Sequence, residues 1–470
     1  MKYQELIDMT IVDSANAIRR KIISPVELVN AELERIEKID KKLNSFLTLF
    51  ADQAIREAKK AESKIVAGEY LGVLHGIPLG LKDLYYTKNL PTTAGSQVIK
   101  DFLPIEDATV VAKLKSAGAI ILGKLNMDEF ARGATNENVH YGVCRNPWDL
   151  ERSPGGSSGG SGAAVSAGLV KGALGSDTAG SIRIPSALCG IVGLKPTYGL
   201  VSIYGVVPLG WTCDHVGPMT RTVSDNAEML SVIAGVDSKD PGTRKVDIPD
   251  YSKSLQKSVK GLKIATLKEF SDLSVDPEVS KSFHNAIKIL EDLGINIEEI
   301  SIPFSLYATA ISDIVIGAES ASFHEPYLKT VPEKYSARLR DRNELGFAIS
   351  AVSYIKAQRA RTILHKHFEQ TFNNIDAIIS PTCAITAPKF GQTTYKVGNV
   401  EESMLGALAK FTRLFNVSGN PSITVPCGFS SEGLPIGLQI VGKSFDELGI
   451  LNIAHAYESA SAWHLSPPIV

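Results

Sequence analysis

The first 70 residues carry the 3.6-residue spacing of apolar positions that is typical of amphipathic helices. Ser24 and Pro25 precede the segment VELVNAELERIEKID and supply an N-cap and a first-turn proline. The apolar positions that recur in this segment are Val26, Leu28, Val29, Leu33 and Ile36. A charged, alanine-rich segment from 51 to 64 predicts a second helix. We expect each helix to pack on a larger body through one face.

From residue 74 onward the apolar runs become short and are interrupted by glycine and proline. The runs GIPLGLKD (76–83) and AIILGKLN (119–126) predict buried strands, and ATVVAKLKSAG (108–118) predicts a helix between them. Such alternation is typical of an α/β fold, in which helices cover both faces of a sheet.

The segment 152–199 is rich in glycine, serine and alanine, a composition that also occurs in flexible linkers. Apolar residues such as Val165, Leu169 and Leu174 are interleaved with its glycines. Because these side chains need a core to pack into, we interpret the segment as a close-packed unit of loop, helix and strand.

Beyond residue 200 the same signals continue to the end of the chain. We expect irregular loops and a helix at 223–233, then a strand at 261–270, a helix at 277–294, mostly helices over 307–373, strands at 376–382, 422–429 and 436–442, and a closing helix at 446–460. A turn, SSEGLP, joins the last two strands.

We find no internal repeat and no clear domain boundary in this pattern. The fold class is therefore α/β, with one large domain over 1–470 and a central mixed, largely parallel twisted sheet. Within it, 1–70 supplies helices packed on the body, 75–200 the chemical core, 200–370 a variable region around the pocket, and 371–470 the strands and helix that complete the sheet.

Composition excludes several classes of protein. Hydrophobic residues make up 44% and charged residues 21%, which is far from the composition of a disordered chain. The formal net charge of -2 gives no reason to expect direct binding to nucleic acid or to a membrane surface. The N-terminus lacks the apolar core of a signal peptide, so we expect a cytoplasmic protein. The 5 scattered cysteines include no Cys-x-x-Cys pair and are expected to be reduced thiols.

The densest chemical signal is the pair of segments SPGGSSGGS (153–161) and GSDTAGSIR (175–183). Glycine-rich loops often hold phosphate, but neither nucleotide-binding fingerprint, G-x-x-x-x-G-K-[ST] or G-x-G-x-x-G in a strand-to-helix turn, occurs here. The other use of such a loop is to bring backbone N–H groups close to a reacting carbonyl. The amides of Thr178, Ala179, Gly180 and Ser181 are suited to this, with Ser181 as a nucleophile.

A serine nucleophile needs a base within hydrogen-bond reach. The chain has no G-x-S-x-G elbow, and of its 9 histidines we place only His140 near this region, without an identifiable partner. A buried lysine can act instead if its pKa falls, and Lys82 at the end of an apolar run is suited to this role. Pairing of Lys82 with Asp83 or another acid is the structural alternative, which the pattern leaves open.

GIPLGLKD, PGGSSGGSGAAV and GSDTAGSIRIPSALCGIVGLKPTYG together resemble the amidase signature family. Further segments, among them DHVGPMTRTVSDNAEML and NVSGNPSITVPCGFSSEGLPIGLQIVG, extend the resemblance over most of residues 5 to 460. The family hydrolyses or transfers amide groups with a Ser-cisSer-Lys triad. The resemblance therefore implies the amidase signature fold, an acyl-enzyme mechanism, and neither a cofactor nor a metal.

Carried over by this resemblance, Lys82 is the base, Ser181 the nucleophile and Ser157 the bridging serine, with a cis peptide bond after Gly156. The amides of residues 178–181 form the oxyanion hole. Asp177 and Arg183 are expected to support the loop, and Ser158 and Ser161 to hydrogen-bond it. Many members have Gly-Gly-Ser at the nucleophile, whereas this chain has Ala179 in the first of these places. An alanine is disfavoured in left-handed backbone, so this difference concerns the detailed shape of the loop and little of the triad.

Two kinds of protein share this signature. One is a free-standing amidase, and the other is the A subunit of the glutamyl-tRNA(Gln) amidotransferase, which releases ammonia from glutamine for its partner subunits. The segment 135–161 resembles that protein closely. A glutaminase needs an acid for the substrate's ammonium, and the stretch 406–415 has Lys410 and Arg413 but no acid. We therefore favour the amide hydrolase.

Other possibilities stay open at this point. A urea, carbamate or ester hydrolase uses the same acyl chemistry, and a catalytically silent binding protein could share the fold. The expected partner is a small-molecule amide, with a homodimer possible and amidotransferase subunits only under the alternative. Segments 211–214, 311–323 and 354–361 could line the pocket, and their content favours an apolar acyl site.

Overall fold

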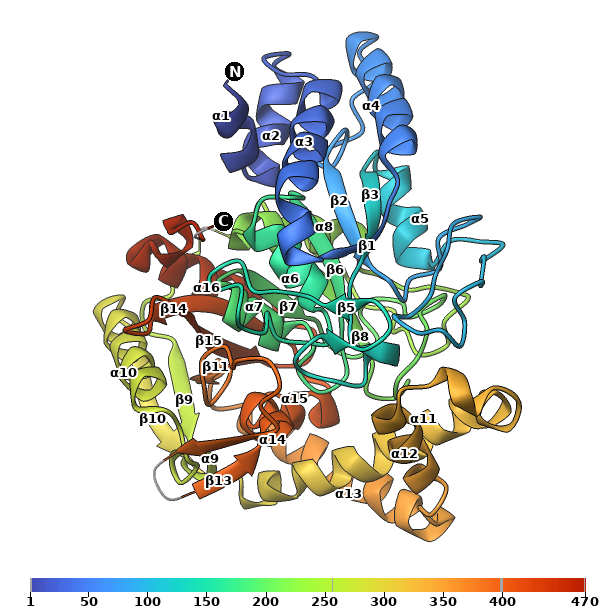
Figure 1. Cartoon of the computed structure of the whole chain (residues 1–470). Helices are drawn as coiled ribbons and strands as arrows, with labels where there is room; N and C mark the ends of the chain where they lie inside the picture. Colours follow the sequence, from blue (N-terminus) through green and yellow to red (C-terminus); the bar gives the residue numbers. More distant parts are fainter. Residues whose placement is uncertain (1, 256, 398–399, 469) are drawn as a thin grey trace.

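A mixed β-sheet runs through the whole molecule (Figure 1). This computed structural model describes residues 2–255, 257–397, 400–468 and 470. Within them the sheet has 11 strands. Their spatial order is β1 (Phe46–Leu49), β3 (Ile120–Leu125), β2 (Pro78–Lys82), β6 (Gly172–Asp177), β8 (His215–Thr220), β7 (Val192–Lys195), β14 (Ser422–Phe429), β15 (Pro435–Gly442), β11 (Ala377–Pro381), β9 (Lys263–Leu267) and β10 (Asn296–Ile300).

The predicted α/β class with a mixed sheet is confirmed. Parallel pairs lie at two places, β3–β2–β6 and β11–β9–β10, and antiparallel pairs join them through the centre. The apolar runs at 76–83, 119–126, 261–270, 376–382, 422–429 and 436–442 all contain strands of this sheet, although residues 268–270 of the third run begin helix α9. Residues from both halves of the chain are thus hydrogen-bonded neighbours.

Strands β1, β8 and β10 were not predicted. The sequence of β8, HVGPMT, contains a glycine and a proline, which ordinarily indicate a loop. Strand β10, NIEEI, lies at the edge of the sheet and is largely exposed, so it lacks an apolar run. The segment 200–260 is therefore less irregular than we expected, because β8 passes through it.

Four helices form the N-terminal part, at the top of Figure 1: α1 (Tyr3–Asp8), α2 (Ile11–Arg19), α3 (Pro25–Leu43) and α4 (Ala51–Val66). The predicted cap of α3 is present, since the Ser24 side chain accepts a hydrogen bond from the Glu27 amide at 3.1 Å. Leu28, Val29 and Ile36 of α3 are buried, as the 3.6-residue spacing predicts.

Helices cover both faces of the sheet. Gly437 and Gly442 of β15 are an odd number of residues apart and so face opposite sides. Gly437 packs against Ala187 of α7 (Arg183–Cys189), and Gly442 packs against Ile450 of α16 (Glu447–Ser461). Because α7 also follows the glycine-rich loop in sequence, this packing fixes the loop against the sheet.

Three helices, α11 (Ala308–Thr330), α12 (Ala337–Gly346) and α13 (Ala351–Thr371), lie together at one corner (Figure 1). Helices α11 and α13 pack against α15 (Arg413–Ser418), which follows α14 (Met404–Ala409), and α12 packs against α11. The other elements are α5 (Thr109–Ser116), α6 (Gly159–Ser166), α8 (Val223–Ile233), α9 (Lys268–Ser271), α10 (Pro277–Asp292), β4 (Glu137–Asn138), β5 (Gly142–Val143), β12 (Thr394–Val397), β13 (Val400–Ser403), and four 3-10 turns, η1 (Glu129–Ala131), η2 (Pro303–Tyr307), η3 (Pro332–Lys334) and η4 (Trp463–Leu465).

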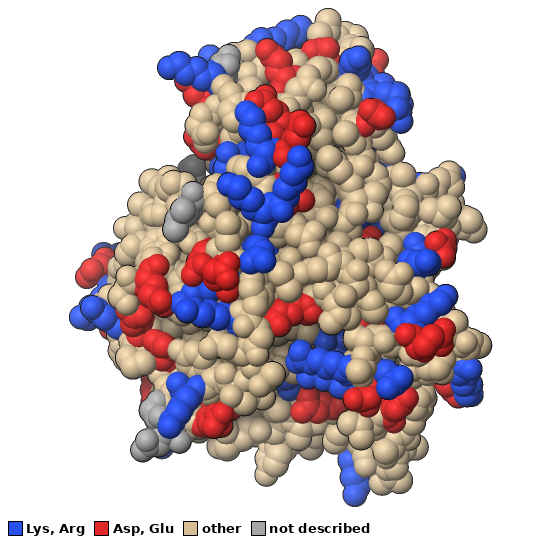
Figure 2. Space-filling view, viewed as in Figure 1, with Lys and Arg blue, Asp and Glu red and all other residues tan. Residues whose placement is uncertain are grey.

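Charges are mixed over the visible surface. Figure 2 shows acidic and basic side chains interspersed on this face, in keeping with the near-zero net charge. Across the residues that the structure describes, we find no helix with the length and apolar character needed to cross a membrane.

Candidate active site

The sheet brings Lys82 and Ser181 to the same edge. Strands β2 and β6 are parallel neighbours, so their carboxyl ends lie side by side. Lys82 is the last residue of β2, and Ser181 lies in the loop that follows β6. The ends of adjacent parallel strands are a common place for reactive groups in α/β folds.

Lys82 is fully buried and is held by two serine hydroxyls. Its Nζ donates to Ser157 Oγ at 2.7 Å and to Ser176 Oγ at 2.9 Å. Burial lowers the pKa of Lys82 to about 7, although Asp128, Asp177 and Asp214 oppose this shift. At pH 7, Lys82 is therefore neutral in a large fraction of the protein molecules, and in these it can accept a proton. The alternative pairing with Asp83 does not occur, since Asp83 lies 3.4 Å from Lys124 instead.

Ser157 reaches Lys82 from the loop that precedes α6. The peptide bond between Gly156 and Ser157 is cis. A side chain at Gly156 would lie 2.1 Å from Asp128 Oδ2 and 2.8 Å from the backbone of Ala134, so only glycine fits here. The neighbouring Ser158 amide donates to the Ser181 carbonyl at 3.3 Å. The bridging-serine loop and the nucleophile loop are therefore joined directly.

Ser158 and Ser161 both bind backbone carbonyls of β6. Ser158 Oγ donates to the Ser176 carbonyl and Ser161 Oγ to the Leu174 carbonyl, each at 3.2 Å. Both serines thus tie the glycine-rich segment to the strand that leads to Ser181.

Ser181 is 6% exposed and lies at the wall of a cavity of about 420 Å³. Among the described residues, we find no protein acceptor for the amides of Thr178, Ala179 and Ser181, and all three residues line this cavity. The Gly180 amide differs, because it donates to Asp177 Oδ1 at 2.7 Å. Ala179 does not have a positive φ, whereas Gly180 has a φ of 128°. Ala179 therefore does not occupy the left-handed backbone in which alanine is disfavoured.

Asp177 and Arg183 form a buried ion pair that shapes this loop. Arg183 donates through two nitrogens to the Asp177 carboxylate, each at 3.0 Å. Burial alone would raise the pKa of Asp177, but Arg183 holds it well below the usual range. Asn416 donates to Asp177 at 2.9 Å, and Gln439 accepts from Arg183 at 2.6 Å. The C-terminal part of the chain therefore contributes to the support of the nucleophile loop.

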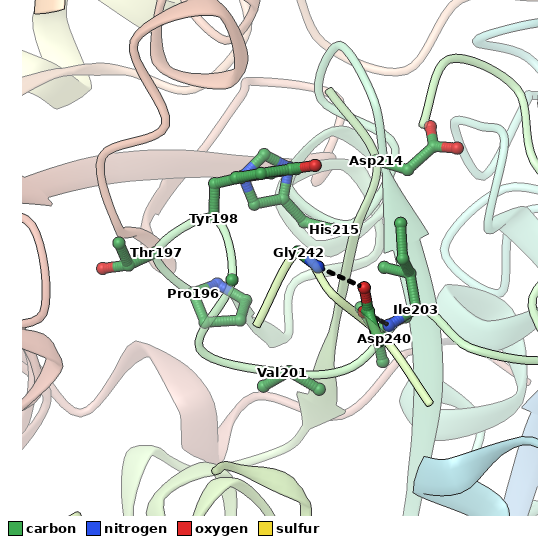
Figure 3. A pocket seen from close by; sticks show the side chains of 11 residues that line it. Pro196, Thr197, Tyr198, Val201, Ile203, Asp214, His215, Asp240 and Gly242 are labelled. Atoms are coloured by element: carbon green, nitrogen blue, oxygen red, sulfur yellow. Dashed lines mark hydrogen bonds between the residues drawn. The ribbon is translucent and has the colours of Figure 1, made fainter. Parts of the chain in front are cut away.

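Asp214, directly before β8, and His215, the first residue of β8, contact the same loop and the end of β6. Asp214 accepts from Thr178 Oγ1 at 2.6 Å, and His215 Nδ1 lies 2.7 Å from the Cys213 carbonyl. Because that carbonyl can only accept, Nδ1 carries the hydrogen. Burial holds the pKa of His215 well below its usual range, so the ring is neutral. In Figure 3 it lies beside the Tyr198 ring, at a separate cavity of about 10 Å³.

The cavity beside Ser181 is strongly basic. Four cationic side chains, Arg132, Arg342, Lys410 and Arg413, line it, and Asp313 is the acidic residue among its described lining. We expected three segments to line a pocket. The segment 311–323 does so, through Ser312, Asp313 and Ile316 of α11. The segments 211–214 and 354–361 face other cavities. Apolar side chains, among them Leu209, Ile316 and Leu405, line the same cavity, so its wall combines the expected apolar residues with charged ones from separate segments.

Three residues that contact this site, Ser176, Thr412 and Asn416, had no role predicted from the sequence, and Asp214 was expected only as part of a pocket-lining segment. Ser176 lies within GSDTAGSIR itself, and Asp214 and Asn416 lie in segments that carry the family resemblance. The family resemblance of these segments could therefore have pointed to the residues, but only the fold shows which atoms they contact. His140, for which no partner was identified, lies 3.0 Å from Glu129.

Comparison with known proteins gives a consistent result over nearly the whole chain. The family model described as "Amidase" matches residues 27–451. The A subunit of the glutamyl-tRNA(Gln) amidotransferase from Geobacillus thermodenitrificans is 42% identical, and the match covers 99% of this chain and 100% of the relative.

Two solved structures are also similar. One comes from a vestigial protein complex related to an s-triazine catabolic enzyme, with a TM-score of 0.92, 32% identity and coverage of 96% of this chain and 98% of that one. The other is the A subunit of the glutamyl-tRNA(Gln) amidotransferase from Thermotoga maritima, with a TM-score of 0.80, 34% identity and coverage of 98% and 95%.

Proposed function

The chain belongs to the amidase family, whose members act on C–N bonds, and from this premise we propose that it cleaves a carboxamide through an acyl-serine intermediate. The observation that carries the proposal is the hydrogen bond from the fully buried Lys82 Nζ to Ser157 Oγ, beside the loop of Ser181. A neutral lysine in contact with a hydroxyl is able to draw a proton along a short chain of side chains.

In the first half-reaction, Ser181 Oγ attacks the amide carbonyl carbon. Its proton passes to Ser157, and the Ser157 proton passes to the lone pair of neutral Lys82. The backbone amides of Thr178, Ala179 and Ser181 stabilise the negative oxygen of the tetrahedral intermediate, at about 3 kcal/mol for each well-placed donor. The C–N bond then breaks, and the proton returns from Lys82 through Ser157 to the leaving nitrogen.

The second half-reaction releases the acyl group. Water takes the place of the departed amine, gives its proton to the same relay and attacks the ester carbonyl of acylated Ser181. The ester C–O bond breaks, Ser181 recovers its proton, and the carboxylic acid leaves. In the net reaction, an amide and water give a carboxylic acid and ammonia or an amine.

For the identity of the amide, the relatives support the glutamine-using amidotransferase component better than the free-standing hydrolase that the sequence favoured. The 42% identity extends over 100% of the relative's length. Under this candidate, the substrate is glutamine, and partner subunits receive the ammonia. A cytoplasmic location belongs to this proposal as well.

The free-standing hydrolase is the second candidate, and the charge of the cavity favours it. Glutamine presents an ammonium group, which needs a carboxylate partner. Asp313 is the acidic residue among the described lining, and it already lies 2.9 Å from Arg413. Function depends on the site more than on the fold, so this observation weighs against glutamine.

Ammonia release by the purified chain separates the two candidates. The hydrolase predicts Ser181-dependent turnover of simple amides by the chain alone. The amidotransferase component predicts glutaminase activity that needs the other subunits of the complex. Ammonia release that persists in Ser181→Ala, or its absence from wild type with and without those subunits, would contradict the proposal as a whole.

A further inference from the structure

Two of the four cations in the cavity beside Ser181 are already neutralised by carboxylates. Lys410 Nζ contacts Glu402 Oε1 and donates to the Ser274 carbonyl at 2.8 Å. Arg413 lies 2.9 Å from Asp313 Oδ1. These two side chains therefore add little net charge to the cavity.

Arg132 and Arg342 are different. Within the described parts of the chain, neither guanidinium has a carboxylate oxygen within the 4.0 Å that defines an ion pair. Arg132 donates instead to the neutral Ile316 carbonyl, at 3.5 Å. Both side chains are partly buried and face the same cavity as Ser181.

Burial and neighbouring cations disfavour the charged form of both guanidiniums. Burial lowers the pKa of Arg132 to about 10, and repulsion from Arg342 and Arg413 adds to this. Burial and repulsion from Arg338 and Arg413 likewise lower the pKa of Arg342. Unpaired like charges in a partly buried site raise the free energy of the ligand-free protein, and a bound anion lowers it again. Such an arrangement is typical of a site for an anionic ligand.

We propose that Arg132 and Arg342 bind a carboxylate of the substrate, so that the site takes the monoamide of a dicarboxylic acid without an ammonium group. Guanidinium and carboxylate match in shape and form charge-assisted hydrogen bonds. The inference rests on the proposed acyl-serine chemistry and deepens the second candidate function. It predicts that glutamine is a poor substrate, because the ammonium group of glutamine would face this positive site.

Three amides of matched length test this inference on the purified full-length chain. Glutaramate has the carboxylate alone, L-glutamine adds the ammonium, and pentanamide lacks both. We expect kcat/KM for glutaramate to exceed that for either of the others by about 10- to 100-fold, the range of a charge-assisted contact. Equal values for glutaramate and pentanamide, or a preference for glutamine, would overturn the inference.

Variants assign the effect to the two arginines. Arg132→Gln and Arg342→Gln should each raise KM for glutaramate about 10-fold or more, and should change kcat/KM for pentanamide much less. Arg340→Gln is the matched control on the same helix, since Arg340 pairs at 3.8 Å with Glu344 and does not line the cavity. An unchanged KM for glutaramate in both cavity variants would contradict the assignment.

A neutral ester separates failure of this inference from failure of the proposed chemistry. p-Nitrophenyl acetate should acylate wild type and both arginine variants in a Ser181-dependent manner, which also reports that the variants fold. Ser181-dependent acylation without any preference for glutaramate overturns the carboxylate site alone. No Ser181-dependent acylation by any compound overturns both.

Discussion

At the scale of single residues, the mechanism depends on the charge of Lys82. Three carboxylates, Asp128, Asp177 and Asp214, favour its protonated form, yet burial outweighs them and leaves the pKa at about 7. Burial dominates because the side chain is fully enclosed and contacts neutral hydroxyls through its Nζ. The same carboxylates would raise the pKa of a lysine that was open to water.

This charge state predicts the pH dependence of activity. Lys82 can accept a proton only when it is neutral, so kcat/KM should rise as the pH increases and level off above the pKa of about 7. Steady-state kinetics from pH 5 to 9 on one amide would measure the midpoint. Lys82→Arg, which stays charged throughout, serves as an inactive comparison. A flat profile over this range would contradict a titrating Lys82.

Local sequence patterns pointed to some parts of the candidate site and not to others. The apolar run that ends at Lys82 and the segment around Ser181 were both singled out, but the pattern left a structural pairing of Lys82 open, and the family resemblance assigned the roles. The positive cavity was not found. Arg132, Arg342 and Arg413 come from separate segments, and no local pattern shows that the fold brings them together.

At the scale of elements, the loop between β6 and α7 determines the geometry around Ser181. Gly180 has a φ of 128°, and a side chain there would lie 2.3 Å from Thr412 Oγ1. Thr412 also donates to the Ala179 carbonyl at 2.7 Å, so its hydroxyl has little freedom to move away. The loop can hold its shape only if residue 180 has no side chain.

Gly180→Ala should therefore displace the loop. We expect kcat to fall by about 100-fold or more, as when an oxyanion donor is lost, and stability to fall by about 1 to 3 kcal/mol. Kinetics and urea unfolding would measure the two effects. Gly433→Ala is the matched control, because Gly433 has a φ of 76° but nothing within 4 Å of a new side chain. Wild-type kcat in Gly180→Ala would contradict this role of the loop.

The predicted strands and helices show where the pattern of apolar residues is informative. Continuous apolar runs correctly indicated β2, β3, β14 and β15, whose burial on both faces requires them. Strand β8 was missed because its pairing with β6 and β7 overrides the glycine and proline in HVGPMT. Edge strand β10 needs no apolar run, since solvent covers most of it.

At the scale of the whole molecule, the sheet joins the two halves of the chain. Strands β14 and β15 from the C-terminal part lie between β7 and β11. The same part supplies Asn416 and Gln439 to the support of Asp177 and Arg183. The active-site loop thus depends on residues more than 200 positions away in sequence.

A truncated chain tests this dependence. A fragment that ends at residue 370 lacks β11, β14 and β15, so we expect no Ser181-dependent activity and no native near-ultraviolet circular dichroism. A chain that ends at residue 462 keeps all strands of the sheet and should retain both. Activity in the shorter fragment would contradict the structural role of the C-terminal strands.

The most direct test of the proposed chemistry is labelling with a fluorophosphonate, which reacts with an activated serine. We expect one adduct, located at Ser181 by mass spectrometry, that forms faster as the pH rises through about 7. Lys82→Ala should slow its formation by at least about 100-fold. An adduct at another residue, or equal labelling rates in wild type and Lys82→Ala, would contradict the mechanism.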